Sequence, residues 1–193
     1  MDPHLRGDDD GSGQPAATQR PSESWGDGDA VIVRKIGWIV AGLVFAVDQL
    51  AKWFINGPLQ LPYRGPMELL PIFRLQWVAN HGVSMGKLVA SSEGQRWALV
   101  LGTAAIALFV AFWLSREKRT MDSVALGLVL GGALGNILDR VRLGYVTDFL
   151  NLHFGAWSPF LVFNIADAAI SIGVALLVLR AFITRDATAP SEE

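Results

Sequence analysis

The chain has 193 residues, of which 51% are hydrophobic, and a formal net charge of −2. It contains no cysteine, which excludes disulfides, thiolate metal sites and a cysteine nucleophile. Its basic residues are scattered rather than clustered, so we expect no nucleic-acid-binding surface. The three histidines, His4, His81 and His153, lack the spacing of metal ligands, so no metal site is predicted.

The N-terminal segment differs in composition from the rest of the chain. Residues 1–29 hold seven acidic and two basic residues, a net charge of −5, whereas the remainder has 11 acidic and 14 basic residues, a net charge of +3. The segment is rich in Gly, Asp, Ser and Pro without an apolar period, which is typical of disorder. We predict a disordered acidic tail over residues 1–33, a membrane domain over residues 34–185, and a C-terminal tail over residues 186–193.

Four apolar runs follow the tail, at about residues 36–55, 97–114, 123–138 and 160–183. A helix that spans a bilayer needs about 20 predominantly apolar residues. The sequence therefore predicts an α-helical integral membrane protein, a four-helix transmembrane bundle with both termini on one side. Basic residues in short connectors mark the cytoplasmic side. The connector at residues 115–122 is dense in them, so both termini are predicted to be cytoplasmic, although the outer loops also carry basic residues.

The long connector after the first span has a pattern of its own. In residues 73–77, three apolar side chains alternate with two polar ones, which is typical of a strand with one apolar face. Residues 83–85 are expected to return as a second strand, and residues 89–96 to form a short helix. Residues 144–153 also alternate. We predict a small extracytoplasmic β-sheet within residues 60–96 and 144–153, with its apolar face towards lipid or the bundle.

Glycine marks a packing face on the third predicted helix. Gly127, Gly131 and Gly135 recur every four residues and so share one side of the helix. Small residues at this spacing allow helices to approach closely in lipid. Ala169 and Gly173 form a similar step on the fourth helix. We therefore expect these residues to bring the third and fourth helices together.

Several polar residues lie in or beside the spans. Asp48 and Lys52 are four apart on the first helix, which favours an internal ion pair over a direct catalytic role. The others on the third and fourth helices are Asn136, Asp139, Arg140 and Asn164. We expect the two asparagines to orient carboxylates or substrate carbonyls, and the Asp–Arg pair to form a hydrogen-bonded anchor at the interface.

Asp167 is an intramembrane acid, placed about seven residues into the last predicted span with no basic residue within four positions. A charged residue at a helix centre in the membrane costs roughly 2.5–3.5 kcal/mol on insertion scales, so such an acid indicates function. Asp148 lies in the outer connector, where an ordinary surface carboxylate is the alternative. As a pair, the two acids would activate water. The ionised acid accepts a proton from the water, and the neutral acid donates a proton to the scissile carbonyl. They would titrate as a unit.

Five stretches occur together in a fixed order: residues 48–52 (DQLAK), 80–86 (NHGVSMG), 131–140 (GGALGNILDR), 146–149 (VTDF) and 163–167 (FNIAD). In these five stretches the chain resembles the lipoprotein signal peptidase (signal peptidase II) family, which are aspartyl proteases of the bacterial inner membrane. The resemblance covers about residues 34–183. Two residues depart from the family pattern. Ala51 stands where Ser or Thr is usual, and Met85 where an aromatic residue is usual.

The resemblance implies cleavage of a prolipoprotein signal peptide immediately before a cysteine that carries diacylglycerol. It implies a catalytic dyad of Asp148 and Asp167 near the extracytoplasmic face, contact with membrane lipid, and neither metal nor organic cofactor. The positions that it implies for substrate binding or support are Asp48, Lys52, Asn80, Gly82, Asn136, Asp139, Arg140 and Asn164. We expect a monomer.

Two other classes of membrane protein fit the sequence less well. A small transporter or proton relay would distribute polar residues across the whole bilayer depth, yet Thr103 is the one polar residue in the run at 97–114. A structural scaffold gives no reason for an unpaired Asp167.

Overall fold

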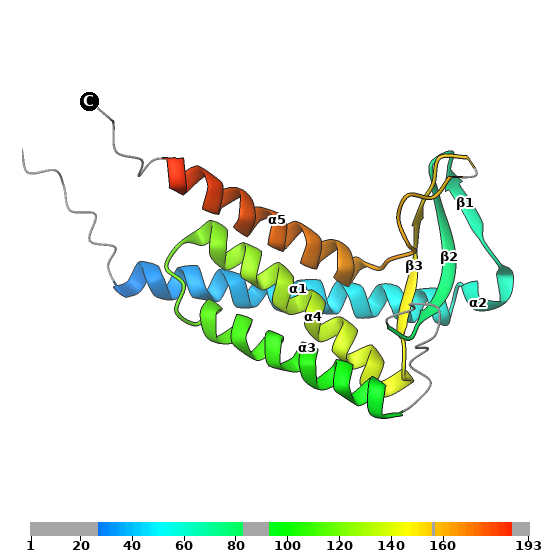
Figure 1. Cartoon of the computed structure of the whole chain (residues 1–193), viewed down its shortest axis with the longest axis horizontal. Helices are drawn as coiled ribbons and strands as arrows, with labels where there is room; N and C mark the ends of the chain where they lie inside the picture. The colour runs from blue at the N-terminus through cyan, green and yellow to red at the C-terminus, as the bar shows by residue number, and fades with distance from the viewer. Residues whose placement is uncertain (1–26, 83–92, 156, 187–193) are drawn as a thin grey trace, which may run out of the picture.

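The structure is a computed structural model that describes residues 27–82, 93–155 and 157–186. Within these residues, four helices are long and apolar enough to cross a membrane. They are α1 (Asp27–Asn56), α3 (Glu93–Leu114), α4 (Thr120–Leu143) and α5 (Ile165–Asp186). They lie side by side as a bundle with a three-stranded sheet across one end (Figure 1). The predicted class of fold, a four-helix membrane bundle with a small sheet, is confirmed.

The N-terminal boundary of the bundle differs from the prediction. Residues 27–33 form the first turns of α1, so the expectation of disorder was wrong for them, and residues 1–26 lie outside the described part. Ala30 and Val33 are buried in this segment. Apolar residues three apart lie on one face of a helix. The burial of this face stabilises the helix although the N-terminal segment as a whole is polar.

Helix α4 is the centre of the bundle, because it packs against α1, α3 and α5. In its most apolar stretch 61% of the residues are buried, compared with 17–22% in the other three helices. Those three present large apolar side chains outwards, among them Leu43, Leu108 and Val178. This distribution is that of one helix enclosed by protein and three that face lipid.

The glycine repeat on α4 faces α1 rather than α5, so the expectation that it joins the third and fourth helices was wrong. A Cβ added at Gly131 would lie 2.5 Å from the carbonyl oxygen of Ala41 on α1. The contact with α5 is made through Gly132 and, as expected, through Gly173, where an added Cβ would lie 2.5 and 2.6 Å from backbone oxygens of the facing helix. A four-residue glycine repeat marks a face of close approach, but it does not say which neighbour of a central helix occupies that face.

The sheet consists of β1 (Met67–Leu70), β2 (Phe73–Asn80) and β3 (Val146–Leu152), antiparallel in the order β1-β2-β3. The predicted strand and its pairing with residues 144–153 are confirmed, whereas β1, which has no alternating pattern, was missed.

The apolar face of the sheet packs on the bundle, since Leu75 and Trp77 contact a cluster around Ile55 and Phe149. The expected strand at 83–85 lies outside the described residues, as does most of the expected helix at 89–96. Its described part is the first turn of α3.

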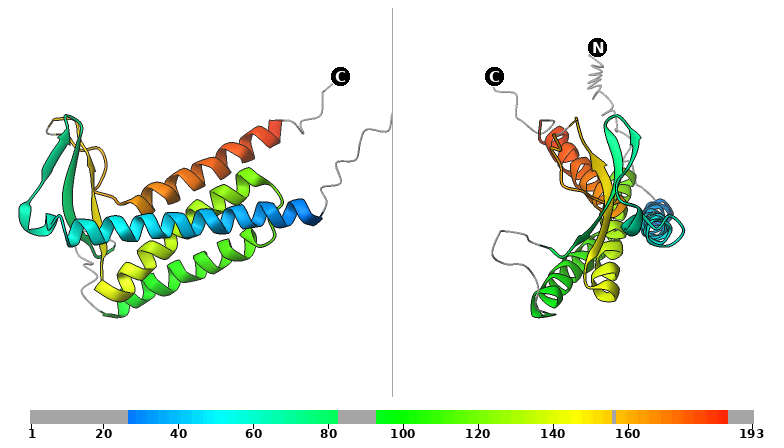
Figure 2. Two further views of the ribbon diagram at one scale, coloured as in Figure 1. Left: turned by 180° about the vertical axis from the view of Figure 1, so that it is seen from behind. Right: turned by 90° about the vertical axis from the view of Figure 1, so that its right-hand side faces the viewer.

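The two ends of the bundle are different. The sheet crosses one end, whereas the start of α1, the connection from α3 to α4 and the end of α5 lie at the other (Figure 2). At this second end Asp122 of α4 is buried and forms an ion pair with Arg180 of α5. The buried Ser123 hydroxyl donates a hydrogen bond of 2.7 Å to the carbonyl oxygen of Val33.

Candidate active site

Helix α5 begins at Ile165, five residues later than its predicted span, because the preceding segment extends the sheet. The backbone N–H and C=O of Phe163 both bond to Leu150 of β3, at 2.9 and 2.8 Å. Asp167 therefore lies in the first turn of α5, and its expected depth of about seven residues into a helix was wrong. It is at the end of the bundle where the sheet packs.

Asn164 and Asp167 cap the start of α5 reciprocally. The backbone N–H of Asp167 donates to Asn164 Oδ1 at 2.9 Å, and the backbone N–H of Asn164 donates to Asp167 Oδ2 at 3.2 Å. This is the geometry of a capping box, with Asn and Asp in place of Ser or Thr and Glu. The cap fixes the orientation of the Asp167 carboxylate through the backbone.

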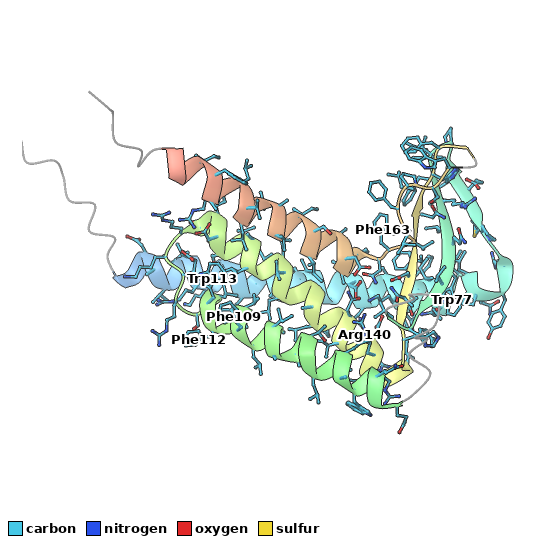
Figure 3. The ribbon with its side chains drawn as sticks, in the orientation of Figure 1. Trp77, Phe109, Phe112, Trp113, Arg140 and Phe163 are labelled. Carbon is cyan, nitrogen blue, oxygen red and sulfur yellow. The ribbon has the colours of Figure 1, made fainter. Side chains whose placement is uncertain are left out.

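The same asparagine reaches the second acid. Asn164 Nδ2 donates to Asp148 Oδ1 at 2.7 Å and to Asn136 Oδ1 at 3.2 Å. Asn136 Nδ2 in turn donates to Asp167 Oδ1 at 2.8 Å. The structure thus links Asp148 of β3 and Asp167 of α5 through the two asparagines. Arg140, on the next turn of α4, lies at the sheet end of the bundle (Figure 3).

Asp148 is enclosed, with 1% of its surface exposed. The pKa of Asp148 is raised to about 6, mainly by burial. The nearby charge of Asp167 also raises it, whereas the hydrogen bonds from Asn80 and Asn164 lower it. Asn80 Nδ2 donates to Asp148 Oδ2 at 2.9 Å. Both oxygens of the Asp148 carboxylate therefore accept from amide groups, with no cation bonded to them among the described residues.

A turn after β2 fixes the amide of Asn80. The backbone N–H of Gly82 donates to Asn80 Oδ1 at 2.9 Å, which leaves Nδ2 to face Asp148. Gly82 has φ of +100°, a region that favours glycine, and an added Cβ would lie 2.5 Å from Leu99 Cδ1. The glycine is therefore required by the turn that orients Asn80.

Lys52 is the centre of a buried charged cluster. Its Nζ lies 2.8 Å from Asp48 Oδ2 and 2.9 Å from Asp139 Oδ2, and it donates to Asn136 Oδ1 at 3.3 Å. The predicted Asp48–Lys52 ion pair is confirmed, but Asp139 pairs with the same lysine rather than with Arg140. Arg140 contacts Asn136 instead, donating from Nη1 to its carbonyl oxygen at 3.4 Å.

The lysine fixes the direction of the asparagine hydrogen bonds. Because an ammonium group has donors and no acceptor, the Asn136 atom that faces Lys52 must be the oxygen. The amide nitrogen of Asn136 then faces Asp167, and the nitrogen of Asn164 faces Asp148.

The two carboxylates beside Lys52 connect separate elements. Asp48 Oδ1 accepts from the backbone N–H of Ala166 at 3.0 Å and so ties α1 to the start of α5. Asp139 Oδ2 accepts from the backbone N–H of Thr147 at 3.1 Å and ties α4 to β3. Sequence reasoning missed Gln49, whose Nε2 bonds to both acids at 3.1 Å, although it lies within the motif at residues 48–52.

An apolar groove of about 530 Å³ opens beside Asp167. Leu152 at the end of β3, the segment between β3 and α5, and α5 itself form it, and among its lining residues only Asp167 and Ser171 are polar. Within the described residues no three His, Cys, Asp or Glu side chains form a metal-ligand group.

The fold and this site define a multi-pass α-helical membrane protein with a pair of acids at one end of its bundle. A family model described as signal peptidase (SPase) II matches residues 40–183. The chain belongs to the signal peptidase II family. It is therefore a peptidase, and its four apolar helices make it a multi-pass bacterial membrane protein.

Relatives and solved structures agree with this membership. The lipoprotein signal peptidase of Rhizorhabdus wittichii is 57% identical over 159 residues, covering 82% of this chain and 92% of the relative. That of Sphingopyxis alaskensis is 48% identical, covering 77% and 86%. Two solved structures of bacterial membrane enzymes have TM-scores of 0.68 and 0.67 at 25% and 27% identity. They cover 82% and 76% of this chain, and 94% and 92% of theirs.

Proposed function

We propose that this chain removes signal peptides from diacylglyceryl-modified prolipoproteins, cleaving before the lipidated cysteine, with Asp148 and Asp167 as the catalytic dyad. Similarity to enzymes named lipoprotein signal peptidase supports the substrate class. The single observation that carries the dyad is that Asn164 bonds to both acids, to Asp148 through its side chain and to Asp167 in a reciprocal cap.

The chemistry follows from two carboxyl groups that hold one proton between them. The ionised carboxylate accepts a proton from water as the water oxygen attacks the scissile carbonyl carbon. The neutral carboxyl donates its proton to the carbonyl oxygen, which gives a neutral tetrahedral diol. Collapse of the diol breaks the C–N bond and re-forms the carbonyl. The protonated acid of the dyad gives its proton to the departing amine of the cysteine residue, and the other carboxylate accepts the proton released by a diol hydroxyl. One water is consumed and the dyad returns to its starting protonation.

Asp148 is suited to hold that proton. Its pKa of about 6, raised mainly by burial and also by the charge of Asp167, lies well above the ordinary value for an aspartate. The surrounding asparagines keep both acids oriented. We assign support or substrate contact to the remaining predicted residues: Asp48, Lys52, Asn80, Gly82, Asn136, Asp139, Arg140 and Asn164.

We also propose that the sheet end of the bundle is extracytoplasmic and that both termini are cytoplasmic. The basic residues of the connector between α3 and α4 lie at the opposite end from the sheet, as the positive-inside rule requires. A lipid-anchored substrate then presents its scissile bond at the outer surface of the membrane, at the depth of Asp167. The apolar groove beside Asp167 provides room for an apolar part of the substrate. We expect the enzyme to act as a monomer.

Cleavage of a lipidated prolipoprotein by the purified protein in detergent tests this proposal. Asp148→Asn and Asp167→Asn are each expected to lower the rate by roughly 10³-fold or more, because each removes a proton-transfer group. Asp122→Asn is the matched control, since Asp122 is also buried but lies at the far end of α4. It should cleave at the parent rate when folded. Activity that survives either dyad substitution would remove that acid from the mechanism.

A further inference from the structure

Two hollows on the α1–α4 face lie apart from the groove beside Asp167. A polar cavity of about 160 Å³ is lined by residues that include Lys52, Trp53, Asp139 and Arg142. An apolar groove of about 340 Å³ is lined by Phe45 on α1 and by four residues of α4. The groove beside Asp167 is formed by α5 and by the segment before it, so it is a separate feature.

The two hollows follow one another along the same helix faces. Phe45 of the apolar groove precedes Gln49 of the polar cavity by four residues on α1. Leu138 precedes Arg142 by four residues on α4 in the same way. Residues four apart share a helix face, and each turn rises about 5.4 Å. The apolar groove therefore lies deeper in the bundle than the polar cavity, which opens near the sheet end.

The polar cavity has complementary charges in its floor and at its mouth. Lys52 and Asp139 are each 4% exposed and form the floor, and the Asp48 carboxylate, which is 0% exposed, lies behind the floor and is paired with Lys52. Arg142 is exposed at the mouth in the last turn of α4, and within the described residues no ion pair includes it. Trp53 is 65% exposed on the same face, a position typical of tryptophan at the membrane–water interface.

We propose that this face binds one membrane phospholipid with a zwitterionic aminoethyl phosphate headgroup, that is, a phosphatidylethanolamine. The Arg142 guanidinium binds the phosphate. The headgroup ammonium faces the Asp139 carboxylate in the floor, and the buried Asp48 carboxylate behind Lys52 adds to the negative charge there. An acyl chain lies in the groove between Phe45 and Leu138, at hydrocarbon depth.

This site does not depend on the proposed function, because it lies on a different face from the groove beside Asp167. The lipid site and the charged cluster have two residues in common. Lys52 and Asp139 line the cavity, and they also form hydrogen bonds with Asn136 and Thr147. A lipid bound there spans α1 and α4. Its binding should therefore raise the thermal stability of the protein as the lipid concentration rises.

Native mass spectrometry of the delipidated protein in detergent, titrated with phosphatidylethanolamine, tests the proposal. We expect one lipid to bind. Arg142→Gln should weaken binding about tenfold by removing the phosphate partner, and Leu138→Trp should weaken it at least as much by filling the groove. The matched controls are Arg64→Gln, an exposed arginine beside the sheet, and Leu108→Trp, an exposed lipid-facing residue of α3. Both controls should bind as the parent does.

Equal binding by the parent, Arg142→Gln and Leu138→Trp would overturn the site. Equal or tighter binding of phosphatidylglycerol would overturn the headgroup assignment, and equal binding of glycerophosphoethanolamine, which lacks acyl chains, would overturn the role of the groove. If Leu138→Trp fails to fold, Arg142→Gln decides the matter, because that side chain is on the surface. A stability increase with phosphatidylethanolamine that Arg142→Gln abolishes is the second expected readout.

Discussion

The two ends of α4 bury acids in different ways. At the end away from the sheet, Asp122 is matched by one cation, Arg180. At the sheet end, Lys52 pairs with both Asp48 and Asp139, while Asp148 and Asp167 have amide and backbone partners. A single ion pair suffices to hold helices together. The sheet end has more carboxylates than cations bonded to them. Some of its carboxylates can therefore gain or lose a proton, as peptide hydrolysis requires.

The difference supports the proposed division of the site into supporting residues and a catalytic pair. Asp48 and Asp139 are bonded to Lys52 and to backbone N–H groups of α5 and β3, so they hold elements in place. Asp148 and Asp167 are each oriented by asparagines. We infer that the charged cluster around Lys52 holds the surrounding elements in place. These elements in turn position the pair formed by Asp148 and Asp167.

The largest expected effect comes from removing the shared cation. Lys52→Met leaves two buried carboxylates without their cation, and breaking a buried pair costs about 3–5 kcal/mol. Arg180→Met leaves one such carboxylate, Asp122, so it should cost less. Thermal unfolding of both variants in detergent measures the difference. Adding Asp139→Asn to Lys52→Met should restore part of the lost stability.

This prediction fails if Arg180→Met proves the more destabilising of the two, or if Asp139→Asn worsens Lys52→Met. Either result would mean that the cluster around Lys52 does not behave as one cation shared by two acids.

A smaller effect is expected at the glycines that allow α4 to meet α1. Gly131→Ala places a Cβ 2.5 Å from the backbone oxygen of Ala41, and overpacking of this kind costs about 1–3 kcal/mol. Gly42→Ala is the matched control on the facing helix, because no atom lies within 4 Å of its added Cβ. That substitution should be neutral or slightly stabilising. Similar unfolding temperatures for the two variants would contradict the close contact of α1 with α4.

Much of the architecture was predictable because it depends on local patterns. Apolar runs of sufficient length indicated the four helices, and the alternation at residues 73–77 indicated β2. The Asp48–Lys52 pair followed from a spacing of four residues on one helix. Each of these features depends on residues that are close in the sequence, and their periodicity records the environment directly.

The features that were missed depend on long-range contacts. The spacing of Gly127, Gly131 and Gly135 could not reveal that they meet α1, because α4 has several neighbours. The start of α5 was placed too early because the backbone pairing of Phe163 with Leu150 has no local signal. Asp139 was not linked to Lys52 for the same reason, since 87 positions separate them in the sequence.

The smallest expected effect is a shift in the pH dependence of activity, which reports the protonation of Asp148. If the dyad works with one shared proton, activity should fall as the pH rises through the pKa of Asp148, about 6, because the proton is then lost. The hydrogen bond from Asn80 favours the ionised form and so lowers this pKa. Asn80→Ala should therefore raise the pKa of Asp148 and move the alkaline limb of the kcat/KM profile to higher pH, by up to about one unit.

Asn151→Ala is the matched control for this shift. Asn151 lies on the same strand as Asp148, but its Nδ2 donates to Gln76 Oε1 at 2.6 Å rather than to the dyad. Its removal should leave the alkaline limb where the parent has it, even if the rate changes. A limb that stays in place or moves to lower pH in Asn80→Ala would show that Asp148 does not hold the proton that the reaction needs. A shift in Asn80→Ala alone would assign the titration to Asp148 and not to the sheet as a whole.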